Sequence, residues 1–96
     1  MQGTSMSELY EYLTYRRDAE FIYDGTTYVI QPEISDKKSW LVIWMISDMP
    51  KCICKREIPP EGDIPKDIID AVLSDKCFDG KSFVDIEKFV EVTVIY

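Results

Sequence analysis

The fold is decided by residues 20–30, which have the sequence EFIYDGTTYVI. Two runs of aromatic and β-branched residues flank the dipeptide Asp24-Gly25, and this combination predicts a β-hairpin because Asp and Gly adopt positive φ at little energetic cost. Side chains alternate between the two faces of a strand, and cross-strand partners share a face. We therefore expect one face of the hairpin to carry four large side chains: Phe21, Tyr23, Tyr28 and Ile30.

A further strand, residues 40–46 with the sequence WLVIWMI, is apolar on both faces. One face carries Trp40, Val42, Trp44 and Ile46. The other carries Leu41, Ile43 and Met45. This pattern is typical of a strand that is covered on both sides at the centre of a sheet. A chain of 96 residues has material for one domain, and a helix layer can cover only one of these faces completely.

The helices follow from caps and periodicity. Ser5 and Glu8 have the spacing of a capping box, which predicts a helix over residues 6–17. A second helix is expected over residues 65–75, and Ser82 is expected to cap a short third one. Residues 51–56 and 90–96 alternate as strands do, and Pro32 is expected to end the second strand of the hairpin.

These elements predict an α+β fold in the order α-β-β-β-β-α-α-β. We expect a mostly antiparallel sheet of four to five strands with two or three helices. Residues 1–5 are predicted to be a disordered or vector-derived leader, and residues 6–96 a single α+β domain.

Charge and hydropathy exclude several classes of function. Eighteen acidic and 11 basic residues give a net charge of −7, which disfavours direct binding to nucleic acid or to an anionic membrane. Residues 57–91 hold ten acidic and four basic residues, so this stretch is either a solvated face or an acidic docking surface. There is no apolar run of membrane-spanning length and no secretory signal, so we expect a cytoplasmic protein that does not bind membranes.

Few residues in the chain suit catalysis or metal binding. Histidine is absent, which removes the commonest general base and most zinc sites. The spacing of Cys52 and Cys54 on a strand is expected to place both sulfurs on one side, and Cys77 does not complete a ligand set without a carboxylate or a second chain. We therefore expect three buried apolar thiols and no zinc. No catalytic, cofactor-binding or metal-binding residues are assigned, and no cofactor is expected.

The two-sided apolar strand predicts self-association. A homodimer would bury the uncovered face, and we expect its interface to include aromatic side chains of the sheet: Tyr23, Tyr28, Trp40 and Trp44. A competing explanation is that residues 82–96 fold across that face and complete a monomeric core.

Two resemblances concern the whole chain. The hairpin motif Glu-Phe-x-Tyr-x-Gly-x-x-Tyr-x-Ile of residues 20–30, the tryptophan-bearing strand and the motif Asp-Gly-Lys-Ser-x-x-x-Ile of residues 79–86 resemble small uncharacterised proteins of Gram-positive gut bacteria and their mobile elements. That resemblance implies no activity. The element order is also similar to that of double-stranded-RNA-binding domains and of small acidic phage inhibitors of CRISPR nucleases. The former use a basic second helix, whereas residues 65–75 hold one Lys and three Asp.

Our leading hypothesis is a non-enzymatic protein that acts through protein contacts, with an unknown protein partner or a second copy of itself. An alternative is an acidic mimic of nucleic acid that inhibits a DNA- or RNA-binding protein. A second alternative is an enzyme that uses carboxylates alone.

Overall fold

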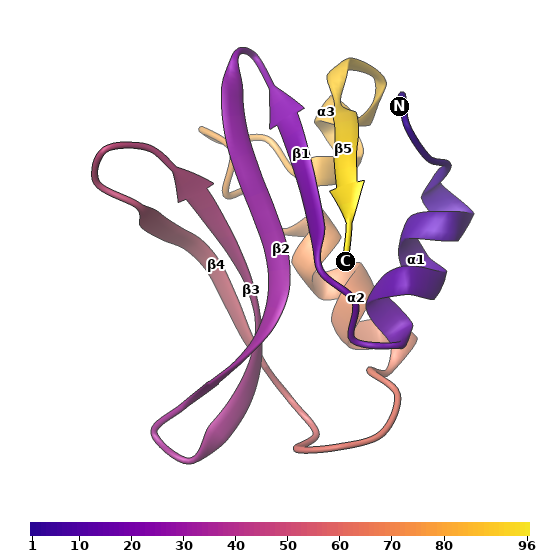
Figure 1. The fold of residues 1–96 in the computed structure, drawn as a ribbon, viewed down its shortest axis with the longest axis vertical. Helices are drawn as coiled ribbons and strands as arrows, with labels where there is room; N and C mark the ends of the chain where they lie inside the picture. The colour runs from indigo at the N-terminus through magenta and orange to yellow at the C-terminus, as the bar shows by residue number, and fades with distance from the viewer.

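Residues 1–96 form a five-stranded sheet and a layer of helices in a computed structural model (Figure 1). The elements are, in chain order, α1 (Met6–Thr14), β1 (Ala19–Tyr23), β2 (Thr26–Ser35), β3 (Lys38–Ile46), β4 (Lys51–Ile58), α2 (Lys66–Ser74), α3 (Phe83–Ile86), a 3-10 turn η1 (Glu87–Phe89) and β5 (Glu91–Ile95). The order and the α+β class are those predicted from the sequence.

All neighbouring strands are antiparallel, in the order β4-β3-β2-β1-β5. The predicted hairpin joins β1 to β2 through a two-residue turn in which Asp24 and Gly25 have φ of 51° and 76°. Phe21 pairs with Tyr28 and Ala19 with Ile30, so the expected face of large side chains is present.

The second hairpin strand is longer than predicted, because β2 continues through Pro32 to Ser35. Pro32 pairs with Leu41 of β3, while β1 begins at Ala19, the partner of Ile30. Pro32 therefore lies where β2 has a neighbour on one side only, a position in which a missing N–H is tolerated.

Two capping boxes begin the helices α1 and α3. Ser5 Oγ accepts from the Glu8 N–H at 3.2 Å, and the Glu8 carboxylate accepts from the Ser5 N–H at 3.3 Å. Ser82 and Asp85 make the same reciprocal pair at α3. α1 ends at Thr14, three residues before the predicted end, because Arg16 takes a φ of 62°.

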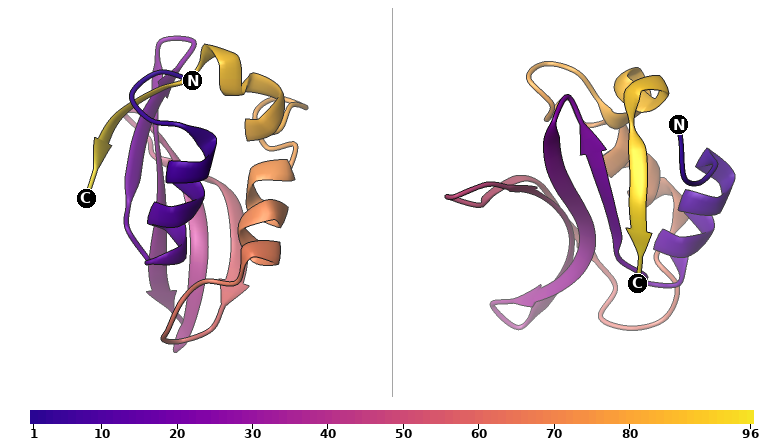
Figure 2. Two further views of the ribbon diagram at one scale, coloured as in Figure 1. Left: turned by 90° about the vertical axis from the view of Figure 1, so that its right-hand side faces the viewer. Right: turned by 45° about the horizontal axis from the view of Figure 1, so that its top comes forward.

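All three helices lie on the same side of the sheet (Figure 2). The core between the two layers holds residues from every strand and helix, the largest of which are Leu9, Leu13, Phe21, Ile30, Leu41, Ile43, Ile69, Leu73, Phe83 and Ile86. None of the helices is both long enough and apolar enough for a membrane crossing.

The last elements do not fold across the other face of the sheet, contrary to the expectation that residues 82–96 cover it. α3 buries Phe83 against Phe21 on the helix side, with ring centroids 5.1 Å apart. β5 extends the sheet beside β1 (Figure 1). One face of the sheet is thus left without a covering layer.

Within residues 1–5, Gln2 pairs with the start of β5. Gln2 forms a parallel bridge with Glu91, donating its N–H to Val90 O at 3.0 Å and accepting from the Val92 N–H at 2.8 Å. Gly3 has a φ of 88°, and a Cβ there would lie 2.0 Å from Val92 O. Only glycine allows the two backbones to approach this closely.

Candidate functional site

The face of the sheet that no helix covers carries a band of apolar side chains. The register places Val29 beside Trp44, and Val42 beside Gln31 and Lys55, so these positions share a face. Ile22, Ile46 and Val94 are 38%, 43% and 36% exposed. We call this surface the open face and define its apolar members as Ile22, Val29, Trp40, Val42, Trp44, Ile46 and Val94.

Hydrogen bonds hold both tryptophans on the open face. The indole N–H of Trp44 donates to the Glu33 carboxylate, which also accepts from the Gln31 amide at 2.8 Å. The indole N–H of Trp40 donates to Ser35 O at 3.1 Å, and Lys55 Nζ lies 4.4 Å from the Trp40 ring centroid. With their polar atoms satisfied, the rings present apolar surface in fixed positions.

Val42 shows how far the two rings shield this surface. It lies between Trp40 and Trp44 on the open face, yet it is only 1% exposed. Beside Trp44, a shallow depression of about 370 Å³ is bounded by Val29, Ile46 and Pro50. The open face is therefore not flat, and a side chain of a partner can fit into this depression.

The other two predicted interface residues, Tyr23 and Tyr28, lie on the helix side of the sheet. Tyr28 is only 9% exposed and stacks on Phe21 with ring centroids 5.3 Å apart. Tyr23 meets Phe78 edge to face at 6.3 Å. The four predicted residues thus belong to two opposite faces, because β1 and β2 turn their largest side chains toward the helices. Of the four, only Trp40 and Trp44 lie on the open face.

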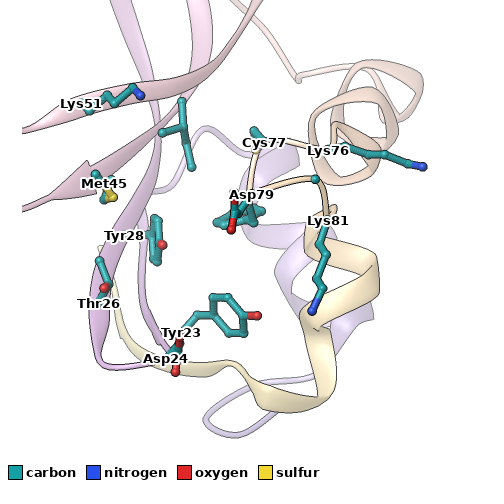
Figure 3. Close-up of a pocket in the computed structure, with 13 residues that line it drawn as sticks. Tyr23, Asp24, Thr26, Tyr28, Met45, Lys51, Lys76, Cys77, Asp79 and Lys81 are labelled. Atoms are coloured by element: carbon teal, nitrogen blue, oxygen red, sulfur yellow. The ribbon is translucent and has the colours of Figure 1, made fainter.

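A cavity of about 640 Å³ opens beside Tyr23 and Tyr28 (Figure 3). Phe78 lines its apolar part. The pKa of Tyr28 is raised, mainly because the side chain is buried. The charged residues of the lining are Asp24, Lys51, Lys76, Asp79 and Lys81. The lining therefore holds two carboxylates and three ammonium groups.

The cysteines are arranged differently from the prediction. Cys54 pairs with Ile43, whereas Cys52 pairs with Trp44, so a bulge leaves Ile53 without a direct partner. An extra residue in one strand reverses the alternation beyond it. Cys52 therefore lies on the open face and Cys54 faces the helices, and the two sulfurs are not on one side.

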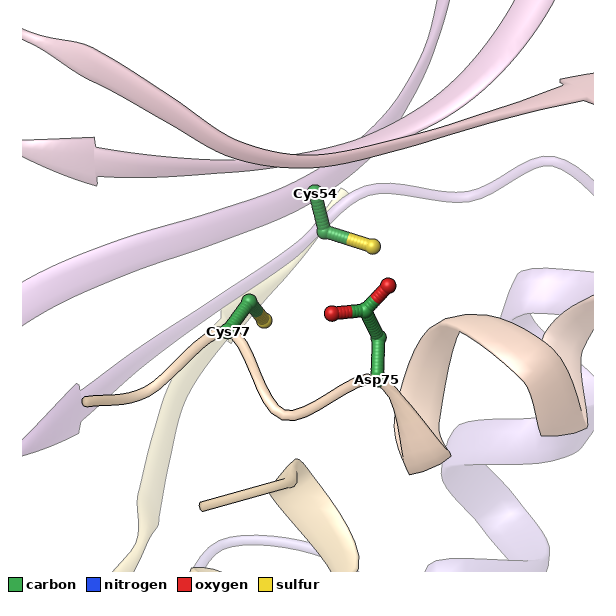
Figure 4. Close-up of side chains that lie close together, drawn as sticks. All are labelled: Cys54, Asp75 and Cys77. Carbon is green, nitrogen blue, oxygen red and sulfur yellow. The ribbon is translucent and has the colours of Figure 1, made fainter. Parts of the chain in front are cut away.

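Cys54 instead approaches two residues that follow α2. Its sulfur, the sulfur of Cys77 and a carboxylate oxygen of Asp75 all lie within 4.8 Å of one another. Figure 4 shows the Asp75 carboxylate directed toward the Cys54 sulfur, with Cys77 beside them. Asp75 Oδ2 also accepts from Arg56 at 3.4 Å.

The two thiols in this cluster differ in acidity. The pKa of the Cys54 thiol is raised. The largest cause is a hydrogen bond to Cys77, and the second is burial. The same hydrogen bond lowers the pKa of Cys77. This contact therefore favours the thiolate form of Cys77 over that of Cys54.

Comparisons with known proteins give no relative to guide these assignments. No family model matches the chain, and no curated protein or solved structure matches it either.

Proposed function

We propose that this is a non-enzymatic protein that acts through protein contacts, and that the open face binds a second copy of the chain. The observation that carries the proposal is the placement of both tryptophans, with their N–H groups already satisfied, on the one sheet face that no helix covers. Tryptophans in such positions are the residues that dominate binding energy at protein interfaces.

The size of the open face suits a homodimer. The molecule measures 33 × 30 × 24 Å, so a face of its sheet has room for the roughly 800 Å² that each partner buries in a standard interface. Two sheets that pack face to face interdigitate the side chains of their inner faces. Trp40 and Trp44, which are partly exposed on this face, supply such side chains.

The charges of the open face also suit a second copy. Lys55 lies on this face together with Glu33 and Glu57, so the face carries both signs although the chain as a whole has a net charge of −7. In an isologous two-fold interface, each Lys55 can approach a carboxylate of the other copy. A strongly acidic partner or nucleic acid would not gain from this arrangement.

We infer a cytoplasmic setting for this dimer, because Cys52, Cys54 and Cys77 are all free thiols. A second candidate function is the acidic mimic of nucleic acid, of the phage or mobile-element type. The acidic excess of residues 57–91 supports it. The two candidates differ in salt dependence, because ionic strength weakens binding to a basic groove and leaves an apolar interface intact.

Light scattering across a concentration series tests the homodimer. We expect twice the 11.2 kDa chain mass at high micromolar concentration, and no dissociation when the salt concentration is raised. Trp44→Glu places like charges at the centre of the interface and should give a monomer. Tyr15→Glu is the matched control, because Tyr15 is 60% exposed and follows α1 on the helix side.

Circular dichroism establishes that both variants are folded. A mass of 11.2 kDa for the wild type at these concentrations would overturn the homodimer. So would a dimer that Trp44→Glu leaves intact. Since the two tryptophans of the chain both lie on the open face, their fluorescence emission should shift to the blue as the dimer forms.

A further inference from the structure

The cluster of Cys54, Asp75 and Cys77 brings together two sulfurs and a carboxylate from parts of the chain that are distant in sequence. Cys54 lies on β4, Asp75 caps the end of α2 and Cys77 follows two residues later. Cys54 is 6% exposed. A metal site built on these cysteines needs a carboxylate as a further ligand, and the packing of α2 on the sheet supplies one.

We propose that Cys54, Asp75 and Cys77 bind a thiophilic divalent cation, with Zn²⁺ as the ion that suits the donor set best. Thiolate and carboxylate oxygen are both zinc ligands, whereas Ca²⁺ and Mg²⁺ require oxygen ligands alone. Three protein ligands leave a fourth position for water. The Asp75 side chain is 34% exposed, so solvent reaches the cluster from that side.

The distances fit a tetrahedral ion. Bonds of about 2.3 Å to sulfur and about 2.0–2.2 Å to oxygen place neighbouring ligands of a tetrahedron roughly 3.5–3.8 Å apart. The three donor atoms already lie within 4.8 Å of one another, so small rotations of the side chains are sufficient to bring them to that spacing. The backbone around Cys54 is fixed by the β3–β4 pairing, which limits the cost of ordering the site.

Charge balance also supports the site. Two thiolates, one carboxylate and Zn²⁺ sum to a charge of −1, and Arg56 beside Asp75 neutralises it. Arg56 engages Oδ2 of Asp75, so the other oxygen of the carboxylate is left to coordinate the ion. An outer partner of this kind orients the ligand and tunes its affinity.

Metal binding displaces the thiol protons. Two neutral thiols and Zn²⁺ give a dithiolate complex and two protons, and no electron is transferred. Affinity should therefore rise with pH.

Cobalt titration of the reduced protein tests the proposal. Co²⁺ replaces Zn²⁺ in tetrahedral sites, and its sulfur-to-metal charge-transfer band reports thiolate ligands directly. We expect this band at one Co²⁺ per chain, and we expect added Zn²⁺ to abolish it. Cys77→Ser and Cys54→Ser should each weaken the band and lower the affinity, while Asp75→Asn should keep the band and lower the affinity about tenfold or more.

Cys52→Ser is the matched control, because Cys52 lies two residues from Cys54 but on the open face. It should bind Co²⁺ as the wild type does. Absence of the band in the reduced wild type would overturn the proposal. So would equal losses in Cys52→Ser and Cys77→Ser, and an unchanged affinity in Asp75→Asn would remove Asp75 from the ligand set.

Thermal unfolding gives a second readout that does not depend on spectroscopy. An ion that binds only the folded chain raises the melting temperature as its concentration increases. We expect Zn²⁺ to raise the melting temperature of the wild type and of Cys52→Ser, and to raise that of Cys77→Ser much less at the same concentration. An equal Zn²⁺ effect in Cys77→Ser would contradict the assignment. Because Cys77 is only partly buried, this variant should fold even if Cys54→Ser does not.

Discussion

The indole N–H of Trp44 donates to the carboxylate of Glu33 on the face of the sheet that no helix covers. Glu33 lies on β2 and Trp44 on β3, so the bond crosses the strand pair and fixes the ring against it. A large apolar ring with a satisfied donor loses little side-chain entropy when a partner binds. The hydrogen bond between Trp44 and Glu33 therefore stabilises the fold and also fixes the position of a ring on the open face.

Glu33→Ala should destabilise the fold by about 1–2 kcal/mol, because it removes the charged acceptor of Trp44 and of Gln31. Glu33→Gln keeps an acceptor oxygen and should retain most of the stability. Denaturant unfolding measures the effect, and tryptophan emission reports the released ring. Glu57→Ala is the control, since Glu57 makes only an exposed ion pair with Lys38 at 3.9 Å. Equal losses in the Glu33 and Glu57 variants would contradict the role of Glu33.

Gly3→Ala should separate residues 1–3 from β5, because the added Cβ would meet Val92 O at 2.0 Å. Hydrogen exchange should show faster exchange of the Val92 amide, which donates to Gln2 O. Gly25→Ala is the matched control, with a φ of 76° and open space around its Cβ, and should cost only the left-handed strain of about 1–2 kcal/mol. Unchanged protection of Val92 in Gly3→Ala would show that the segment does not need this glycine.

Phe83→Ala should destabilise the fold by about 3–5 kcal/mol, because Phe83 is fully buried against Phe21 and Phe78. Phe89→Ala lies in the same helical region but Phe89 is 75% exposed, so its effect should stay within about 0.5 kcal/mol. Urea unfolding of the two variants measures the difference. Similar stabilities would mean that α3 does not pack as described.

Tyr10 makes the stability depend on pH in alkaline solution. Burial, with a smaller contribution from its hydrogen bond to Asp70, raises the pKa of Tyr10 from 10.0 to about 12. The unfolded chain therefore loses this proton first, so the stability that the shift provides is complete below pH 10.0 and is lost as the pH rises toward about 12.

Tyr10→Phe should be less stable than the wild type at neutral pH by about 1 kcal/mol. The gap should shrink as the pH rises through the window between 10.0 and about 12. Tyr12→Phe is the control, because the Tyr12 ring contacts Arg17 and its hydroxyl makes no hydrogen bond within the chain. A gap that does not change with pH would contradict the coupling between Tyr10 and Asp70.

Local patterns predicted much of the fold. The Asp24-Gly25 turn, the capping boxes at Ser5 and Ser82 and the alternation of residues 40–46 each depend on neighbours in sequence, and each is present. The separation of the two faces of β3 followed from this alternation. So did the placement of Trp40 and Trp44 on a face without cover.

Features that depend on long-range contacts were not predictable in this way. Gln2 pairs with Glu91 across almost the whole chain, and no local signal marks that pairing. The turn at Asp36-Lys37 has φ of 54° and 63° without a glycine, so the β2–β3 pairing holds a lysine in a conformation it does not prefer.

The cysteine cluster was missed for two physical reasons. The bulge at Ile53 turns Cys52 to the open face while Cys54 faces the helices, and a bulge has no sequence signature in a strand such as KCICKREI. Asp75 and Cys77 reach Cys54 only because α2 packs on the sheet. The spacing Asp75-x-Cys77 was the one local hint, because it brings two metal-ligating residue types together at the end of a helix.

The pairing of Gln2 with β5 limits how the molecule can polymerise. Strand addition needs unpaired backbone, and the first residues occupy part of the β5 edge, leaving a stretch too short to template another strand. The opposite edge, β4, is bent by its bulge and carries Lys51 and Lys55. A sheet with at most one edge available for strand pairing can pair with one other sheet, and no further sheet can be added. Open-ended fibres by edge-to-edge growth are therefore disfavoured, whereas the assembly that we propose through the open face would end at two copies.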